Sequence, residues 1–171
     1  METIKIPPKR MAIYKKNNNA LMTELCERGK VVARLNEGDI EIDGEGGDTW
    51  AAQMVVNAIN LGFEPAKAFK LLSDEYYLEV VDLDTYFRGN EKLTERYLAR
   101  VIGEEGKSKR IIEDLSDAHI SIWEHSVGII GRFEELSDAK EAVMRLLEGS
   151  THSGVFSYLE RQKKLKRLPR N

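Results

Sequence analysis

The sequence has little of several features, and each shortage narrows the possible function. It contains one cysteine, Cys26, so it can form neither an internal disulfide nor a cysteine-based metal cluster. We expect Cys26 to be a small apolar side chain on a helix. No apolar run approaches the ~20 residues that cross a bilayer. The first residues also lack the apolar segment of a signal peptide, and we therefore expect a cytoplasmic protein without membrane contact.

An overall excess of positive charge is also missing. The chain has 26 basic and 29 acidic residues and a net charge of −3, which argues against nucleic-acid binding by bulk attraction. The basic residues are unevenly placed, however. Residues 161–171 carry no acid and six cations, and residues 5–16 form a second cluster without acids. Contact with a polyanion should therefore be local.

What the sequence does contain is an internal repeat with an offset of 87 residues. Gly44 corresponds to Gly131, and Ala52 corresponds to Ala139. The alternating apolar residues at 31, 33 and 35 likewise correspond to those at 118, 120 and 122. A repeat that stays in phase through several elements indicates a duplicated domain. With 171 residues, 42% hydrophobic and 32% charged, the chain fits two small globular domains, which we place at residues 1–73 and 74–171.

Hydrophobic periodicity and turn signals predict the same order of elements in both halves, which indicates an α+β fold. The first half reads strand, helix, loop, helix, strand, strand and helix, at residues 3–6, 8–15, 16–19, 21–29, 30–35, 39–43 and 48–61. The second half repeats this order at residues 76–83, 91–102, 103–106, 107–115, 118–123, 127–131 and 134–147.

Caps and connections complete this prediction. We expect Gly29 to end its helix in the position that favours glycine, and Asp48 or Thr49 to cap the helix that follows the second strand. Residues 65–73 read as an additional helix that joins the copies. A last helix begins near Ser153 and becomes wholly basic, so its first turns should dock on the body and its end should project.

The two copies differ at one loop. The second copy has Gly103-Glu104-Glu105-Gly106, whereas the first has lysine and asparagine at the glycine positions. Glycine has no Cβ, so a phosphate can come close to the backbone, and the amides of the following helix favour an anion. Lys107, Lys109 and Arg110 lie in the first turn of that helix, where cations oppose the helix dipole. This combination predicts a phosphate-binding loop.

The other two Gly-x-x-Gly strings, at 44–47 and 128–131, lie at strand ends and are explained by turns and packing.

These residues resemble a known family. The order of elements around Gly-x-x-Gly is similar to that of two tandem type I KH domains, each β-α-α-β-β-α, packed together and followed by a basic C-terminal helix. Residues 101–108, 146–149 and 151–160, with the basic end, resemble archaeal relatives of the eukaryotic partner-of-Nob pre-ribosomal factor. KH domains clamp the backbone of about four single-stranded nucleotides.

The resemblance implies a protein that is not an enzyme. It implies an RNA-binding assembly factor for the small ribosomal subunit that binds the 3′ end of the small-subunit rRNA or its precursor. It also implies two protein partners, the PIN-domain endonuclease that trims this end and translation initiation factor two alpha. We expect a monomer that needs no cofactor.

The predicted RNA-binding residues follow from the loop, the cations beside it and the basic tail. They are Gly103, Glu104, Glu105, Gly106, Lys107, Lys109, Arg110, Arg100, Ile102, Ile120, Arg161, Lys163 and Lys164. A weaker set lies in the first copy and comprises Lys9, Arg10, Lys15, Lys16 and Asn19. Because its loop lacks both glycines, we expect the first copy to be mainly a structural or protein-contact unit, with RNA contact as the alternative. Asn19 tolerates a left-handed conformation better than most residues.

Several other residues have more ordinary interpretations. His119, His125 and His152 lack the spacing of metal ligands, and we expect no metal site. Asp82 and Asp84 should form a solvated face of a strand. Trp123 should pack in the core, although it could instead border a base-stacking surface.

Two alternative functions stay open. Net acidity and the two loop glutamates favour a scaffold in which both domains contact proteins and RNA binding is incidental. A two-KH transcription factor of the RNA polymerase apparatus also fits the repeat, but it leaves the basic helix after Gly149 unexplained. We find no pairing of nucleophile and base that would indicate an enzyme.

Overall fold

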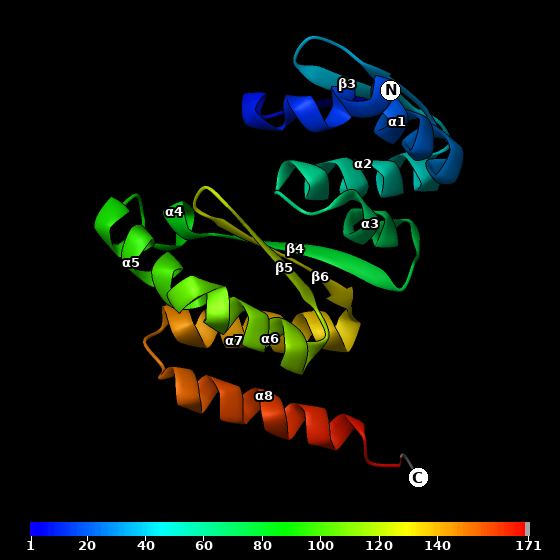
Figure 1. The fold of residues 1–171 in the computed structure, drawn as a ribbon. Helices are drawn as coiled ribbons and strands as arrows, with labels where there is room; N and C mark the ends of the chain where they lie inside the picture. Colours follow the sequence, from blue (N-terminus) through cyan, green and yellow to red (C-terminus); the bar gives the residue numbers. More distant parts are fainter. Residues whose placement is uncertain (170–171) are drawn as a thin grey trace. The chain divides into compact units, whose positions relative to one another are not determined.

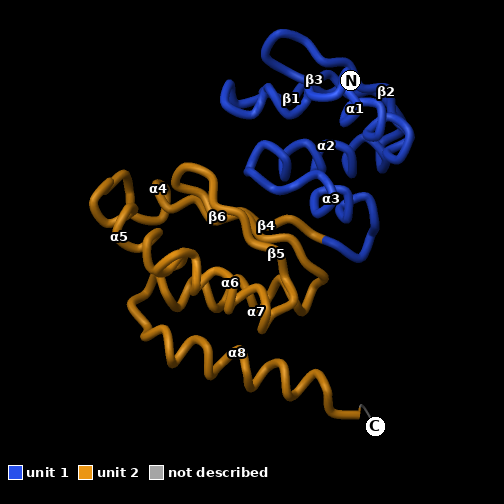
Figure 2. The backbone as a smooth tube through the Cα atoms, in the orientation of Figure 1, with its two compact units in different colours: residues 1–76 blue, residues 77–171 orange. Residues whose placement is uncertain are grey.

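The computed structural model describes residues 1–169 (Figure 1). The chain forms two compact units, Met1–Tyr76 and Tyr77–Asn171 (Figure 2). The boundary between them lies three residues beyond the predicted one at residue 73. We call them unit 1 and unit 2.

Unit 1 combines a three-stranded antiparallel sheet with helices. Its elements are β1 (Glu2–Lys5), the 3₁₀ turn η1 (Pro8–Arg10), α1 (Met11–Gly29), β2 (Val32–Leu35), β3 (Asp39–Asp43), α2 (Gly46–Asn60), α3 (Pro65–Ala68) and the 3₁₀ turn η2 (Phe69–Leu72). The strand order is β1-β3-β2. Ile40 of the central strand lies opposite Ile4 of β1 and Leu35 of β2. Ile40 and Ile42 are fully buried, as are Val55 and Val56 of α2, so this side of the sheet faces the core.

Helix α1 is interrupted at the predicted loop. Lys16 has extended backbone angles, and Asn17, Asn18 and Asn19 have φ values of 52°, 55° and 60°. Three consecutive left-handed residues break the helix, and asparagine adopts this conformation at lower cost than most side chains. The first helical segment, from Met11, therefore ends just before Lys16.

Two predicted helix ends in unit 1 need correction. Gly29 is the last residue of α1 and is buried; Lys30 takes the left-handed conformation at φ 54°. A Cβ on Gly29 would lie 3.4 Å from the Val31 side chain, an ordinary packing distance, so Gly29 is not the left-handed glycine that the sequence predicts. Helix α2 begins at Gly46 with Glu45 as its N-cap, before the predicted caps at Asp48 and Thr49.

Unit 2 repeats this plan with longer elements. They are β4 (Tyr76–Asp82), α4 (Leu83–Tyr86), α5 (Glu91–Ile102), the 3₁₀ turn η3 (Glu104–Gly106), α6 (Lys107–Ser116), β5 (His119–Trp123), β6 (Ser126–Arg132), α7 (Phe133–Leu147) and α8 (His152–Lys166). The strand order is β4-β6-β5, the same as in unit 1. Strands β5 and β6 are antiparallel, with Ile120 opposite Ile129.

The core of unit 2 lies between its sheet and its helices. Helices α5, α6 and α7 cover one face of the sheet, and α8 packs against α6 and α7 on the side away from the sheet (Figure 1). Val101, Ile112 and Val143 are fully buried between these layers. The loop that joins α5 to α6 is therefore held at both ends by helices anchored in the core.

Helix α8 is attached to unit 2 along most of its length, contrary to the prediction that its basic end projects. The Thr151 hydroxyl caps its start by accepting a hydrogen bond from the Gly154 amide at 3.1 Å. Val155 and Leu159 are fully buried. Farther along, Lys163 Nζ donates to the Asp114 carbonyl at 2.7 Å, and Lys166 Nζ lies 2.5 Å from Asp138 Oδ2.

Across the described part of the chain, no helix combines the length and apolar character needed to span a membrane.

Candidate nucleic-acid interface

The two glycines of the loop after α5 have different roles. Gly103 has φ 75° and ψ 173°, and a Cβ there would lie 2.6 Å from the backbone nitrogen of Ser108. No side chain fits at that distance, so the fold itself requires Gly103. Gly106 also has φ 75°, but no atom lies within 4 Å of the place its Cβ would occupy. The side of Gly106 that lacks a Cβ is therefore open to an approaching ligand backbone.

The backbone amides of the loop are partly occupied. The Gly106 amide donates to the Gly103 carbonyl at 3.2 Å, and the Lys107 amide donates to the Glu104 carbonyl. These two N–H groups close the turn and do not point free toward a phosphate. Close approach at Gly106 and side-chain charge are thus the main means by which this loop can hold a phosphate.

The charged side chains around the loop fall into two groups. Glu104 and Glu105 are exposed, and Glu105 is left-handed at φ 51°. Lys107 and Arg110 are exposed on α6, whereas Lys109 lies 3.4 Å from Glu113 in an ion pair. Lys107 and Arg110 are therefore better placed than Lys109 to contact a phosphate.

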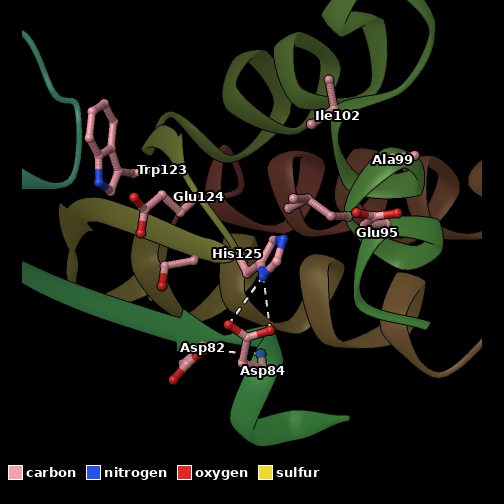
Figure 3. A pocket seen from close by; sticks show the side chains of 10 residues that line it. Asp82, Asp84, Glu95, Ala99, Ile102, Trp123, Glu124 and His125 are labelled. Atoms are coloured by element: carbon pink, nitrogen blue, oxygen red, sulfur yellow. Dashed lines mark hydrogen bonds and ion pairs between the residues drawn. The ribbon is translucent and has the colours of Figure 1, made fainter. Parts of the chain in front are cut away.

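A groove of about 670 Å³ runs along α5 to the turn between β5 and β6 (Figure 3). Leu98, Ala99 and Ile102 supply an apolar wall from α5, and Trp123 lies across from them. Ile102 directly precedes Gly103, so the groove begins at the loop. Trp123 borders this groove, which is the alternative that the sequence left open. Such walls accept the flat faces of unpaired bases.

Ile120, one of the predicted RNA-binding residues, lies in the core. Its side chain is 4% exposed and packs within the hydrophobic cluster of unit 2. Ile120 does not line the groove, whereas Ile102 does. The two residues lie on different elements: Ile120 belongs to β5 and packs in the core, whereas Ile102 is the last residue of α5 and lines the groove.

Most of the other side chains along the groove are acidic, and the remaining two are His125 and Ser126. Four carboxylates line it: Asp82, Asp84, Glu95 and Glu124. Asp84 lies 2.9 Å from His125 Nδ1, and Asp82 accepts hydrogen bonds from the Asp84 amide and the Thr85 hydroxyl (Figure 3). Asp82 and Asp84, which were predicted to form a solvated strand face, thus line a groove, and Asp82 also caps α4. Carboxylates repel phosphates but accept hydrogen bonds from the amino groups of bases. A bound strand would place its phosphates at the loop and its bases in the groove.

Arg100 has a structural role that the sequence did not predict. Its guanidinium donates to the carbonyl oxygens of Leu146 and Ser150, at the end of α7. The Arg100 carbonyl in turn lies 2.8 Å from His152 Nε2 at the start of α8. We therefore correct its predicted role as a phosphate contact: Arg100 connects α5 to the junction of α7 and α8.

Some cations of the basic helix α8 attach it to unit 2, whereas others are exposed to solvent. Lys163 and Lys166 bind acceptors on unit 2, so the predicted RNA contact Lys163 is also reassigned to a structural role. Arg161 and Lys164 are exposed on the outer side of α8. Arg170, which the sequence includes in the basic tail, lies outside the described residues.

Unit 1 has a groove at the corresponding place. It measures about 590 Å³ and is lined by Lys15, Asn19, Leu35, Asn36 and Glu37. The 87-residue offset places Lys15, Asn36 and Glu37 at the positions of Ile102, Trp123 and Glu124. The position is therefore common to both units, but unit 1 lacks the apolar wall and the tryptophan.

Not all of the weaker candidate residues of unit 1 are free of structural contacts and exposed for RNA binding. Arg10 Nε donates to the Ile59 carbonyl at 2.9 Å, so Arg10 joins η1 to α2. Lys9, Lys15, Lys16 and Asn19 are exposed. Within residues 1–169, no group of three or more histidine, cysteine, aspartate or glutamate side chains is arranged to hold a metal ion.

Sequence reasoning missed the groove because its walls come from three separate segments. The side chains at 95, 98, 99 and 102 recur at helical spacing, which could have identified one wall. The turn at 123–126 and the carboxylates at 82 and 84 are brought to it only by the tertiary fold.

Comparison with known proteins agrees with this geometry. Residues 77–164 match the family model for the second KH domain of PNO1, described as a eukaryotic type KH domain (KH domain type I). A KH domain-containing protein of Methanocaldococcus jannaschii is 38% identical over 98% of this chain and 76% of the relative. The pre-rRNA-processing protein pno1 of Aspergillus fumigatus is 31% identical over 92% of this chain, which spans 66% of that longer relative.

A solved structure is similar over nearly the whole chain. It is a chain of the a/eIF2alpha–aDim2p–rRNA complex from Pyrococcus horikoshii, with 33% identity and a TM-score of 0.85, covering 95% of this chain and 93% of that one. The family model, the identity to the archaeal relative and the open loop beside a base-sized groove lead to one assignment. This chain belongs to the PNO1 family of KH-domain proteins.

Proposed function

We propose that this protein is a single-stranded RNA-binding factor that acts without catalysis in the maturation of the small ribosomal subunit. Unit 2 binds the 3′ end of the small-subunit rRNA or its precursor. The observation that carries the proposal is the open side of Gly106, in a loop that follows directly after Ile102 of the apolar groove wall. Relatives named as pre-rRNA-processing proteins, and a similar structure whose complex contains rRNA, support the choice of RNA.

We further propose that both units are type I KH domains and that the chain divides near residues 73–76. The shared strand order, the loop at the same offset and the matching grooves support this. Unit 1 then serves mainly as a structural or protein-contact unit, because Asn19 places a side chain at the position of the open Gly106.

The RNA-binding residues follow from this arrangement. Gly106 admits the RNA backbone, Lys107 and Arg110 contact phosphates, and Ile102 supports a base in the groove. Arg161 and Lys164 extend the basic surface along α8. Gly103, Glu104 and Glu105 shape the loop, and Lys109 is held by Glu113.

A pair of matched variants tests the loop assignment. Gly106→Asp places a carboxylate at the open surface, and Asn19→Asp places one at the equivalent residue of unit 1, 87 positions earlier. Both positions have positive φ, but only Gly106→Asp introduces a Cβ there, so the folding of both variants must be measured alongside their affinity. Fluorescence anisotropy with a labelled oligonucleotide from the 3′ end of small-subunit rRNA would measure the affinity of each.

We expect Gly106→Asp to weaken RNA binding at least tenfold and Asn19→Asp to leave it within twofold of wild type. Circular dichroism would verify that both variants are folded. If folded Gly106→Asp binds as tightly as wild type, the loop is not the phosphate site.

The same role implies protein partners. The similar Pyrococcus chain comes from a complex with a/eIF2alpha, so we propose this initiation factor as a partner, together with the PIN-domain endonuclease of small-subunit maturation.

The four carboxylates along the groove favour a competing function, a protein scaffold for which RNA is incidental. A pull-down with and without complete RNase digestion separates the two. Partners that survive digestion, with no measurable affinity for free RNA, would support the scaffold.

A further inference from the structure

A second pocket lies on the α8 side of the Gly103–Gly106 loop, apart from the groove along α5. It measures about 260 Å³. The loop contributes Gly103 and Glu104, α6 contributes Lys107, Ser108 and Ile111, and α8 contributes His152 and Phe156. Because it shares loop residues with the proposed phosphate site, a strand bound there passes the mouth of this pocket.

Ser108 is the unusual residue in this pocket. It is 3% exposed, and its hydroxyl has no hydrogen-bond partner. A buried hydroxyl without a partner destabilises the fold, and alanine would preserve the close packing against Gly103 without that cost. A serine at this position is therefore explained by a polar group that enters the pocket.

Unit 1 provides an internal comparison, because the residues at the equivalent positions are buried there. The residue 87 positions before Ser108 is Leu21, which is buried with an exposed fraction of 8%. The residue 87 positions before Phe156 is Phe69, which is 2% exposed and covered by the Arg28 guanidinium 4.5 Å from its ring centroid. In unit 2, Phe156 is half-buried and faces the pocket. The unit that has the glycine loop therefore also has the serine with an unpaired hydroxyl and the accessible phenylalanine.

We propose that this pocket binds one nucleobase of the RNA strand, from a nucleotide adjacent to those held in the groove. The Phe156 ring stacks on the base, the Ser108 hydroxyl hydrogen-bonds its edge, and Lys107 contacts the phosphate of the same nucleotide. The inference rests on the proposed function of unit 2 as an RNA-binding unit. It extends the binding site past the loop toward α8.

The chemistry of the lining favours a base over other occupants. Ile111 and Phe156 offer apolar and aromatic surfaces, which suit the π face of any base. A hydroxyl both donates and accepts, so Ser108 can pair with either kind of group on a base edge. Exposed Lys107 at the rim supplies a cation for the attached phosphate. A base inside a duplex cannot enter, so the pocket selects unpaired RNA.

Fluorescence of a base analogue tests this inference. An rRNA 3′-end oligonucleotide would carry 2-aminopurine at one position at a time, and its emission would be measured with and without protein. We expect stacking on Phe156 to quench one position just outside the nucleotides bound by the groove. Phe156→Leu should abolish that quenching and weaken binding roughly five- to fiftyfold, in keeping with the loss of one stacked base. Ser108→Ala should keep the quenching and weaken binding about threefold.

Phe133→Leu is the matched control, because Phe133 is an exposed phenylalanine of the same unit, outside the pocket. It should behave as wild type. If wild type binds RNA through Gly106 but no position is quenched, or Phe156→Leu and Ser108→Ala both match Phe133→Leu, the pocket does not bind a base and the proposed function stands. If wild type binds no RNA, both proposals fail.

Discussion

The loops of the two units share left-handed backbone at their last two residues but differ at the first, where Lys16 has φ −63° and Gly103 has φ 75°, and in the surface they present. Asn18 and Glu105 have φ values of 55° and 51°, and Asn19 and Gly106 have 60° and 75°. Asparagine thus reproduces the left-handed backbone of the second loop. It does not reproduce the open surface, because Asn19 has a side chain where Gly106 has none. The comparison teaches that left-handed backbone at the end of the loop is not sufficient to create an open surface.

The units also use different chemistry for the same mechanical connection. In unit 1, the Tyr14 hydroxyl donates to Asn60 Oδ1 at 2.9 Å, which joins the segment before the loop to the end of α2. In unit 2, Arg100 joins α5 to the end of α7 through two backbone carbonyls. Both connections hold the helix that leads into the loop. The position of the loop is therefore maintained in each unit, whether or not it binds RNA.

The largest expected difference between the units is in stability at the first position of the loop. Gly103→Ala forces a Cβ into the backbone of Ser108 at a positive φ, whereas Lys16→Ala changes an exposed, extended residue. We expect Gly103→Ala to lower the free energy of unfolding by ~3 kcal/mol or more. Lys16→Ala should change it by less than about 0.5 kcal/mol. Urea unfolding would measure both, and a loss below about 1 kcal/mol in Gly103→Ala would contradict the role of this glycine.

Alkaline pH should affect unit 1 through Tyr14. Burial raises the pKa of the Tyr14 phenol well above its ordinary value, and the nearby Arg10 lowers it by a smaller amount. The unfolded chain therefore loses this proton at a lower pH than the folded chain, so stability falls as pH rises through about 10. The loss should approach ~1.4 kcal/mol per pH unit above that point.

Tyr14→Phe tests this by removing the titrating group. The slope of unfolding free energy against pH, measured by urea unfolding between about pH 9 and pH 11, should become shallower than in wild type. Burial also raises the pKa of Tyr158 in unit 2, so part of the slope should persist. An unchanged slope in Tyr14→Phe would exclude the Tyr14 contribution.

The salt dependence of RNA binding should separate exposed cations of the two units. Replacing Arg161 and Lys164 of α8 by glutamine should reduce the slope of log affinity against log salt by about 0.7 for each lost phosphate contact. Replacing Lys9 and Lys15 of unit 1 should leave the slope unchanged. Equal reductions in both double variants would show that unit 1 also contacts RNA, which removes the asymmetry between the units.

The smallest expected effect comes from giving unit 1 the loop of unit 2. Lys16→Gly with Asn19→Gly restores both glycines, but the groove keeps Lys15 and Asn36 in place of Ile102 and Trp123. We expect RNA affinity within about twofold of wild type and stability within ~0.5 kcal/mol. A clear gain in affinity, measured in a Gly106→Asp background, would show that glycines alone are sufficient for binding.

Much of the fold was predictable from local signals. Helix α5 spans Glu91–Ile102 as predicted, because its apolar residues recur at helical spacing and Asn90 caps it by accepting a hydrogen bond from the Leu93 amide. The loop residues were also found, since glycine and asparagine mark left-handed backbone. The short helix α4 was missed because four residues carry too little periodic pattern.

The parts of the site that were missed depend on distant contacts. Arg100 and Lys163 look in sequence like free cations, and only the fold brings backbone carbonyls from residues 146, 150 and 114 to them. Ile120 has the same apolar character as Ile102. Only the tertiary fold places Ile120 in the core and Ile102 beside the groove. Nothing in the local sequence around Ser108 indicates a binding residue. The 87-residue offset, however, pairs Ser108 with Leu21 and shows that a polar residue stands where unit 1 has an apolar one.

The common strand order has a consequence for the assembly of the chain during synthesis. In each unit the first strand must pair with the third, across the helices and the strand that lie between them in the sequence, before the sheet is complete. Repeat proteins are prone to exchanging equivalent elements between neighbours while they fold. β1 has four residues and β4 has seven, so an exchanged strand would match its new sheet poorly in length. The difference in length between these two strands therefore disfavours misassembly of the nascent protein.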